Sequence, residues 1–317
     1  MRLLFMGTPG FAVPSLDALL DEGYNIVGVV TQPDKPKGRG LKLSVSPVKE
    51  VALKRKLTLY QPASIKTASF TDELKTLDLD IAVVVAYGKI LPKEILSLPG
   101  LGCVNVHASL LPKYRGAAPI NWAIINGEEQ TGITIMYMDV GLDCGNIIAQ
   151  EAIKIFSSDT AGILHDKLSY FGAELLIKSL KKIKGGDPDS YPQDHKLATY
   201  APILKKEDGR IDWAKTAQEI RNLVRGVNPW PGAYTCLNGN LLKIWRVELG
   251  EGVEVPELSE LSKIPGKIVK IDKKEGIYIT TGNGILCIKE LQKEGGKRMK
   301  VNEFLRGNRI EIEDLFQ

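Results

Sequence analysis

An imidazole, an amide and a carboxylate could converge at one place in this chain. Asn105 and His107 lie two residues apart at the end of the apolar run 101–104, and side chains two apart on a strand point to the same face. A second apolar run, residues 133–138, precedes Asp143. Functional groups in open α/β sheets gather at the carboxyl ends of the strands, so we expect the three side chains to meet at that edge.

These side-chain types suit the transfer of an acyl group. An imidazole that titrates near neutral pH can accept the proton that an attacking nucleophile loses. The Asn105 amide can donate a hydrogen bond to a carbonyl oxygen on which negative charge develops. The Asp143 carboxylate can hold the imidazole and stabilise its cation. His165, in a predicted helix, and His195, in a polar stretch, are interpreted as structural or solvated.

The composition is that of a globular protein with two domains. The chain has 317 residues, of which 44% are apolar and 25% charged, and this length exceeds one ordinary domain. No apolar run reaches the roughly 18 residues that a membrane helix needs, and residues 1–7 lack a signal peptide's long apolar region. We therefore expect a cytoplasmic protein without a membrane partner.

Cysteine and histidine usage argues against disulfides and against a metal site. The four cysteines are scattered, and only three histidines are present, so we expect reduced thiols and no bound metal. The net charge of +4 permits a polyanionic partner without requiring one.

Alternating strand and helix patterns in the first half predict an α/β fold with a Rossmann-like, doubly wound, mostly parallel sheet. The expected strands cover residues 2–6, 26–31, 57–60, 80–85, 102–107 and 132–138, and the expected helices cover 11–22, 46–55, 70–77, 92–97, 117–126 and 160–184. The first strand is followed by Gly7-Thr8-Pro9-Gly10. Because the third glycine of a dinucleotide-binding motif is absent, this stretch is interpreted as a structural turn.

The second half of the chain has a different pattern. Residues 187–209 are polar and contain prolines, which is typical of an extended linker. A helix near 214–226 and short strands at 233–237, 241–248, 266–271, 276–281 and 284–291 follow, and they favour a smaller, OB-like β-barrel. We predict a catalytic domain at residues 1–189, a linker at 190–207 and a C-terminal barrel domain at 208–317.

Residues 105–143 resemble the formyltransferases that use 10-formyltetrahydrofolate. That family has an Asn-x-His pair, a Ser-Leu-Leu-Pro stretch and a later Asp, which this chain matches at Asn105, His107, Ser109 to Pro112 and Asp143. The resemblance implies that Asn105, His107 and Asp143 are catalytic and that no metal takes part. It also implies that the folate cosubstrate contacts four residues, namely Ser109, Leu110, Leu111 and Pro112. Enzymes that formylate glycinamide ribonucleotide or amino sugars, and formyltetrahydrofolate hydrolase domains, share these motifs.

Other stretches are similar to the methionyl-tRNA formyltransferases. They are Phe5-Met6-Gly7-Thr8-Pro9, Thr31 to Gly40, Ser46-Pro47-Val48-Lys49, Val84 to Gly88, Arg210-Ile211-Asp212-Trp213 and Asn228-Pro229-Trp230-Pro231-Gly232. The resemblance covers nearly the whole chain. It implies formyl transfer from 10-formyltetrahydrofolate to the α-amino group of methionyl initiator tRNA, and we expect a monomer. The alternatives are an enzyme with a small amine acceptor, such as an amino-nucleotide or amino-sugar, and an inactive scaffold that binds nucleic acid.

A basic loop follows the second expected strand. It holds Lys35, Lys37, Arg39 and Lys42 among glycines and prolines. Such a loop can be a solvated surface, or it can be an arm that meets RNA phosphates with its lysines and reaches a groove or base with Arg39. The resemblance favours the RNA arm, and Lys206 could extend the same basic surface.

Overall fold

The chain divides into two compact units in the computed structural model. Unit 1 consists of Met1–Pro119, Gln130–Lys154 and Leu164–Pro202, and unit 2 consists of Ile120–Glu129, Ile155–Ile163 and Ile203–Gln317. The structure describes residues 1–37, 42–186, 189–250, 252 and 264–317. No helix among these described residues is both long and apolar enough to cross a membrane. The boundaries 1–189, 190–207 and 208–317 stay a prediction.

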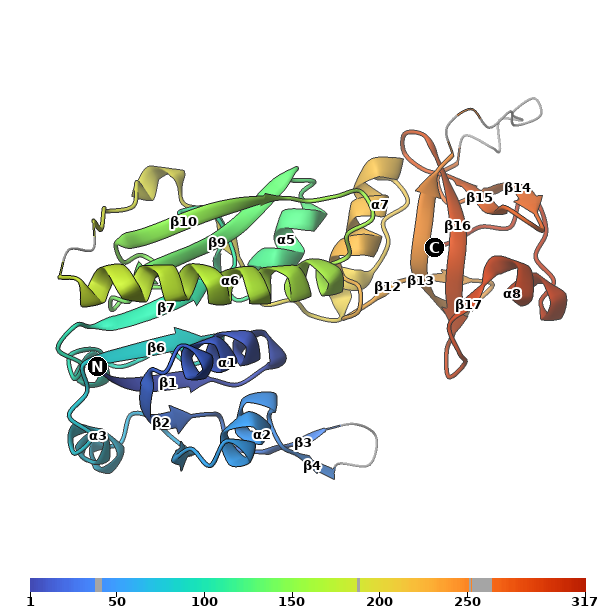
Figure 1. Ribbon diagram of the computed structural model, residues 1–317. Coiled ribbons are helices and arrows are strands. Elements are labelled where there is room, and N and C mark those ends of the chain that lie inside the picture. Colours follow the sequence, from blue (N-terminus) through green and yellow to red (C-terminus); the bar gives the residue numbers. More distant parts are fainter. Residues whose placement is uncertain (38–41, 187–188, 251, 253–263) are drawn as a thin grey trace. The chain divides into compact units, whose positions relative to one another are not determined.

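Unit 1 is built on a seven-stranded sheet with the order β10-β9-β7-β6-β1-β2-β5 (Figure 1). Its strands are β1 (Arg2–Gly7), β2 (Asn25–Val30), β5 (Leu59–Tyr60), β6 (Ile81–Val85), β7 (Cys103–His107), β9 (Gln130–Tyr137) and β10 (Ile147–Lys154). The strands from β5 to β7 are parallel, whereas β9 is antiparallel to β7 and to β10. The predicted mostly parallel sheet is confirmed. The edge strand β10 was not predicted.

Helices cover both faces of this sheet. They are η1 (Gly10–Ala12), α1 (Val13–Asp21), α2 (Pro47–Lys54), α3 (Ala68–Lys75), α4 (Lys93–Leu96) and the long α6 (Ala161–Lys184). Gly172 of α6 packs against Val106 of β7, and Lys181 of α6 pairs with Glu22 at the end of α1. On the opposite face, Phe70 of α3 and Ile95 of α4 belong to one apolar core with alternate residues of β1 and β6. The sheet is therefore doubly wound.

The strand order reverses between β1 and β6. The chain passes from β1 to β2 on one side and later returns to β6 on the other side. In open α/β sheets, ligands bind in the crevice outside the carboxyl ends of the strands at such a switch point. Gly7, at the end of β1, approaches β6 so closely that a Cβ atom would lie 2.9 Å from the carbonyl oxygen of Val85. Gly7 in the turn after β1 is thus required by close packing.

The basic loop contains a two-stranded antiparallel hairpin of β3 (Lys35–Lys37) and β4 (Lys42–Ser44). Lys35 pairs with Ser44, and Lys37 pairs with Lys42. Arg39 lies outside the described residues.

The stretch predicted as an extended linker includes short regular elements. They are the 3-10 turns η2 (His195–Leu197) and η3 (Glu207–Gly209) and strand β11 (Tyr200–Ala201), which pairs in parallel with β8 (Arg115–Gly116). This pairing ties the residues after the long helix back to the segment that follows β7.

Unit 2 is a small antiparallel barrel with flanking helices. Its strands are β12 (Ala233–Leu237), β13 (Asn240–Leu249), β14 (Ile268–Asp272), β15 (Gly276–Thr280), β16 (Ile285–Lys293) and β17 (Met299–Lys300), in the order β12-β13-β16-β15-β14 with β17 beside β16. The helices are α5 (Pro119–Ile125), α7 (Ala217–Gly226) and α8 (Val301–Gly307), and α7 and α8 bury Ile220 and Phe304 in the barrel core.

The C-terminal residues join the two edge strands of this barrel. Gln317 exchanges backbone hydrogen bonds of 2.8 and 2.9 Å with Cys236 of β12. The N–H of Ile268 in β14 donates to the carbonyl of Asp314 at 3.0 Å. Because one segment bonds to both edges, it closes the sheet, and the separate C-terminal domain of antiparallel strands predicted from the sequence is confirmed.

Candidate active site

The predicted catalytic side chains come from β7 and from the loop after β9. Asn105 and His107 lie on the same face of β7, which is held between β6 and β9 in the middle of the sheet. Asp143 follows β9, and the structure brings it to His107. The His107 and Asp143 side chains are 6% and 14% exposed, respectively, so charges placed there are only weakly screened by water.

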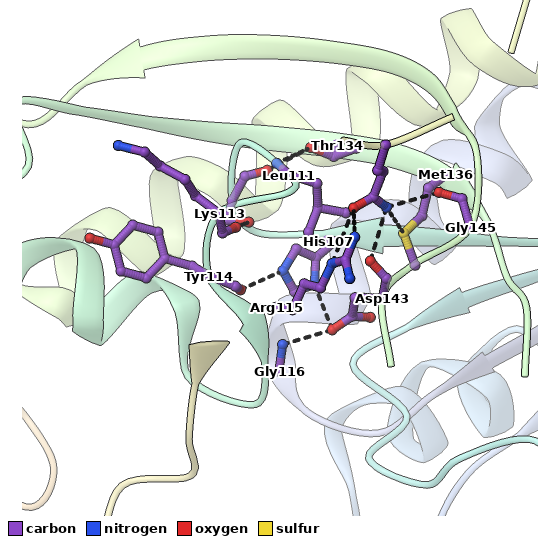
Figure 2. Close-up of polar contacts among 12 residues, drawn as sticks. His107, Leu111, Lys113, Tyr114, Arg115, Gly116, Thr134, Met136, Asp143 and Gly145 are labelled. Carbon is purple, nitrogen blue, oxygen red and sulfur yellow. Dashed lines mark hydrogen bonds and ion pairs between the residues drawn. The ribbon is translucent and has the colours of Figure 1, made fainter. Parts of the chain in front are cut away.

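The imidazole of His107 is held through one ring nitrogen. Nε2 lies 3.0 Å from the carbonyl oxygen of Tyr114 (Figure 2). Because a carbonyl can only accept a hydrogen bond, Nε2 carries a proton. In the neutral ring Nδ1 is therefore an acceptor, and it faces Oδ2 of Asp143 at 3.6 Å. Nδ1 of His107 and Oδ2 of Asp143 are thus two facing acceptors that together can take up one proton.

Asp143 is held in an uncommon backbone conformation. Its φ of 47° lies in the left-handed region, which costs a residue other than glycine about 1–2 kcal/mol. Its Oδ2 accepts a hydrogen bond of 2.8 Å from the N–H of Gly116 in β8. The carboxylate is thus fixed between a backbone donor and the ring of His107.

Asn105 presents an amide that the protein does not use. The residue is half-buried, and within the described part of the chain its side-chain amide has no hydrogen-bond partner. The amide therefore remains available to a substrate oxygen.

The segment from Ser109 to Pro112 is a turn that is anchored to β9. Thr134 Oγ1 donates to the carbonyl of Ser109 at 2.7 Å and accepts from the N–H of Leu111 at 3.1 Å. Ser109 and Leu111 are buried, whereas Leu110 and Pro112 are partly exposed. Leu110 and Pro112 are thus the members of this segment whose side chains a ligand can reach.

Two buried polar residues that were not assigned from the sequence complete the region. Arg115 and Gln193 are 4% and 6% exposed, and two guanidinium nitrogens of Arg115 donate to Oε1 of Gln193 at 2.6 and 3.2 Å. Nε2 of Gln193 donates to the carbonyls of Asp143 and Gly145. Arg115 lies inside the family-like block 105–143, but Gln193 lies in the predicted linker, where nothing in the sequence marks it.

The predicted tRNA-contacting residues belong to other parts of the chain. Lys35, Lys37 and Lys42 lie on the β3–β4 hairpin of unit 1, and Lys206 is an exposed residue of unit 2 at the start of η3. Arg39 lies outside the described residues. Among the residues that the structure describes, no group of three or more His, Cys, Asp or Glu side chains is arranged to hold a metal ion.

Two family models match this chain. One, described as formyl transferase, matches residues 1–180, and the other, described as the C-terminal domain of formyl transferase, matches residues 203–309. The methionyl-tRNA formyltransferase of Alkaliphilus oremlandii is 52% identical over 311 residues, which cover 98% of this chain and 98% of that protein. The methionyl-tRNA formyltransferase of Clostridioides difficile is 52% identical over 312 residues, with the same shares covered.

Solved structures share the fold. An N-formyltransferase from Helicobacter canadensis, in complex with folinic acid and dTDP-3-aminofucose, has a TM-score of 0.65 at 21% identity, covering 92% of this chain and 99% of that one. HypX from Aquifex aeolicus, in complex with tetrahydrofolic acid, has a TM-score of 0.61 at 16% identity, covering 99% of this chain and 50% of that one. This chain therefore spans about half the length of HypX.

Proposed function

This chain belongs to the formyltransferase family, among the methionyl-tRNA formyltransferases, and we propose that it formylates the α-amino group of methionyl initiator tRNA with 10-formyltetrahydrofolate during translation initiation. The observation that carries this proposal is the 52% identity to a methionyl-tRNA formyltransferase over 98% of both chains. A small amine acceptor is not favoured, because this chain is only 21% identical to the Helicobacter canadensis N-formyltransferase that was solved with dTDP-3-aminofucose. All residues of the proposed catalytic site lie in unit 1 of a single chain, which supports a monomer, and the tRNA substrate supports a cytoplasmic location.

The chemistry sets two requirements for the site. 10-Formyltetrahydrofolate supplies a formyl group on an activated amide-like nitrogen. The α-amino group of the acceptor attacks as the neutral amine, after its ammonium form has lost one proton to the solvent. Its nitrogen gives up a second proton to the site once it has bonded to the formyl carbon. The bond from that carbon to the folate nitrogen then breaks, and the folate nitrogen gains a proton. A proton acceptor and a donor for the formyl oxygen are therefore needed, and the side chains of this site fit both needs.

The His107–Asp143 pair supplies the proton acceptor. Nε2 of His107 is engaged by the Tyr114 carbonyl, so Nδ1 is the nitrogen that exchanges a proton with the substrate, directly or through water. The arriving proton makes the ring cationic, and the carboxylate 3.6 Å away stabilises that cation. The same pair can return the proton to the leaving folate nitrogen.

Asn105 supplies the donor for the formyl oxygen. When the amine attacks, negative charge develops on that oxygen, and an amide N–H held in place stabilises it more than it stabilises the ground state. The segment Ser109, Leu110, Leu111 and Pro112 lines the pterin side of the folate pocket in this proposal. Its anchoring to Thr134 keeps its shape constant, and Leu110 and Pro112 offer apolar contact.

The β3–β4 hairpin contacts the tRNA in this proposal, with Lys35, Lys37, Arg39 and Lys42 on one arm and Lys206 as a further cationic contact. The base of the hairpin is well anchored. Just before β3, the Asp34 carboxylate accepts a hydrogen bond of 2.6 Å from Nζ of Lys49.

A third residue, Gln61, joins this anchor. Lys49 Nζ donates to Gln61 Oε1 at 2.7 Å, and Gln61 Nε2 donates to Asp34 at 3.1 Å. The hydrogen bond from Lys49, followed by that from Gln61, lowers the pKa of Asp34. The Asp34 carboxylate therefore stays ionised at neutral pH. Its hydrogen bonds to Lys49 and Gln61 hold the chain in place just before β3.

An acceptor panel tests this function. The purified protein is incubated with 10-formyltetrahydrofolate and with Met-tRNA, glycinamide ribonucleotide or a UDP-amino sugar, and the formylated products are measured by mass spectrometry. We expect formyl-methionyl-tRNA and no formylated small acceptor. Formylation of a small acceptor at a higher kcat/KM than that of Met-tRNA would overturn the assignment.

A further inference from the structure

Gln193 joins the two ends of the turn that carries Asp143. Its Nε2 donates to the carbonyl of Asp143 at 2.9 Å and to the carbonyl of Gly145 at 2.8 Å. Gly145 has no room for a side chain, because a Cβ atom there would collide with the carbonyl of Tyr137. The turn is therefore held by close packing of Gly145 against β9 and by the two hydrogen bonds from the Gln193 amide.

We propose that Gln193 is a positioning residue for formyl transfer, which sets the Asp143 carboxylate against His107, and that Arg115 fixes the orientation of Gln193. This inference rests on the proposed function, because it concerns the residues assigned to the proton transfer. Gln193 touches neither substrate in this account and acts through Asp143.

Arg115 decides which way the Gln193 amide points. A glutamine amide can rotate by half a turn and exchange its oxygen with its nitrogen. A guanidinium group can only donate hydrogen bonds, and two of its nitrogens meet Oε1 of Gln193 at 2.6 and 3.2 Å. With the oxygen held at Arg115, both N–H groups of Gln193 must face the loop carbonyls.

Arg115 and its neighbour Gly116 thus hold Asp143 from two directions. Gly116 N–H binds the carboxylate directly at 2.8 Å, whereas Arg115 acts on the backbone through Gln193. This double support suits a residue with a left-handed φ of 47°, since such a conformation persists only where the surroundings determine it. Without Gln193, the carbonyls of Asp143 and Gly145 lose this donor and the turn relaxes.

The expected consequence is a loss of rate without a loss of binding. A displacement of about 1 Å in a catalytic group can lower a rate roughly 100-fold. Gln193→Leu keeps the volume and removes both N–H donors, so we expect kcat to fall about 10- to 100-fold, with both KM values changed less than about 2-fold. The matched control is Gln218→Leu on α7, which loses a hydrogen bond to Asn222 of 2.8 Å and should keep the parental kcat.

Gln193→Glu separates a positioning role from a structural one. The glutamate keeps an oxygen for Arg115 and gains an ion pair with it, but it has no N–H group for the two carbonyls. If Gln193 serves only as the partner of Arg115, this variant is stable and active. In our proposal it is stable and as slow as Gln193→Leu.

A double variant tests whether Gln193 acts through Asp143. Asp143→Asn combined with Gln193→Leu should be no slower than Asp143→Asn alone, because the first change already removes what Gln193 positions. Multiplied losses would overturn the proposal.

A readout that needs no activity is the ¹⁵N signal of the His107 ring followed by NMR across pH. It should change in both Gln193 variants and not in Gln218→Leu. Parental kcat or unchanged ring signals in folded Gln193 variants overturn this inference alone. A parent protein that does not formylate Met-tRNA removes the proposed function instead, and the ring signals then still decide the positioning role.

Discussion

Replacing Asp143 by asparagine removes a negative charge and keeps the shape of the side chain. The asparagine oxygen can still accept the hydrogen bond that the N–H of Gly116 gives to Oδ2 at 2.8 Å. The variant loses the attraction between the carboxylate and the proton that arrives on Nδ1 of His107, 3.6 Å away. We expect kcat to fall while both substrates still bind.

The geometry sets the size of this effect. Opposite unit charges about 4 Å apart attract by about 4 kcal/mol at an effective dielectric constant of about 20. The oxygen dipole of asparagine and nearby water replace part of this attraction, so the figure is an upper limit. Since about 1.4 kcal/mol corresponds to a tenfold change in rate, the limit is close to 10³-fold, and we expect kcat to fall by about 10²- to 10³-fold.

Rapid-quench measurement of formyl-methionyl-tRNA at saturating substrates gives the comparison. The control is Asp139→Asn in the same loop, where the carboxylate accepts from the N–H of Val140 at 2.7 Å and does not belong to the proposed site. A loss of less than about threefold in Asp143→Asn, or an equal loss in both variants, would refute the charge argument.

Three further predictions concern other residues. Asn105→Ala should lower kcat by about 10²–10³-fold with little change in either KM; steady-state kinetics check this, and a parental kcat removes Asn105 as the oxyanion donor. Arg39→Ala should lower kcat/KM for Met-tRNA and leave the folate KM unchanged, and Arg39→Lys should restore kcat/KM only in part. A parental kcat/KM in the alanine variant would exclude a role for Arg39 in tRNA recognition. Burial raises the pKa of Cys103 to about 12, so at pH 8 it stays a protonated thiol. Mass spectrometry should find that iodoacetamide labels the half-buried Cys144 and Cys236 before Cys103, and prompt labelling of native Cys103 would contradict this.

Strands buried on both faces were predictable because they are continuous apolar runs. β6, Ile-Ala-Val-Val-Val, is buried along its whole length, and its neighbour β1 is buried from Leu3 to Gly7. β10 was not predicted because it is an edge strand whose residues from Gln150 to Lys154 are mostly polar, and none of them is fully buried. Its two opening isoleucines alone did not distinguish it from a loop.

The site was predictable only in part. That Asn105 and His107 share a face follows from the period of two in a strand. The approach of Asp143 to Nδ1 rather than Nε2 depends on the carbonyl of Tyr114, which no side-chain pattern specifies. Gln193 is 50 residues from Asp143 in the sequence, and a polar residue in a polar stretch gives no sign that it is buried.

The most direct test of the central claim is a single turnover by His107→Ala. The variant and its parent are each saturated with 10-formyltetrahydrofolate and Met-tRNA, and the first formyl transfer is followed by rapid quench, with both substrates also titrated by fluorescence. The control is His165→Ala, which replaces a partly exposed histidine of α6 that contacts Asp166. We predict that His107→Ala binds both substrates as the parent does and transfers the formyl group orders of magnitude more slowly, while His165→Ala matches the parent. Transfer by His107→Ala at the parental rate would contradict the account.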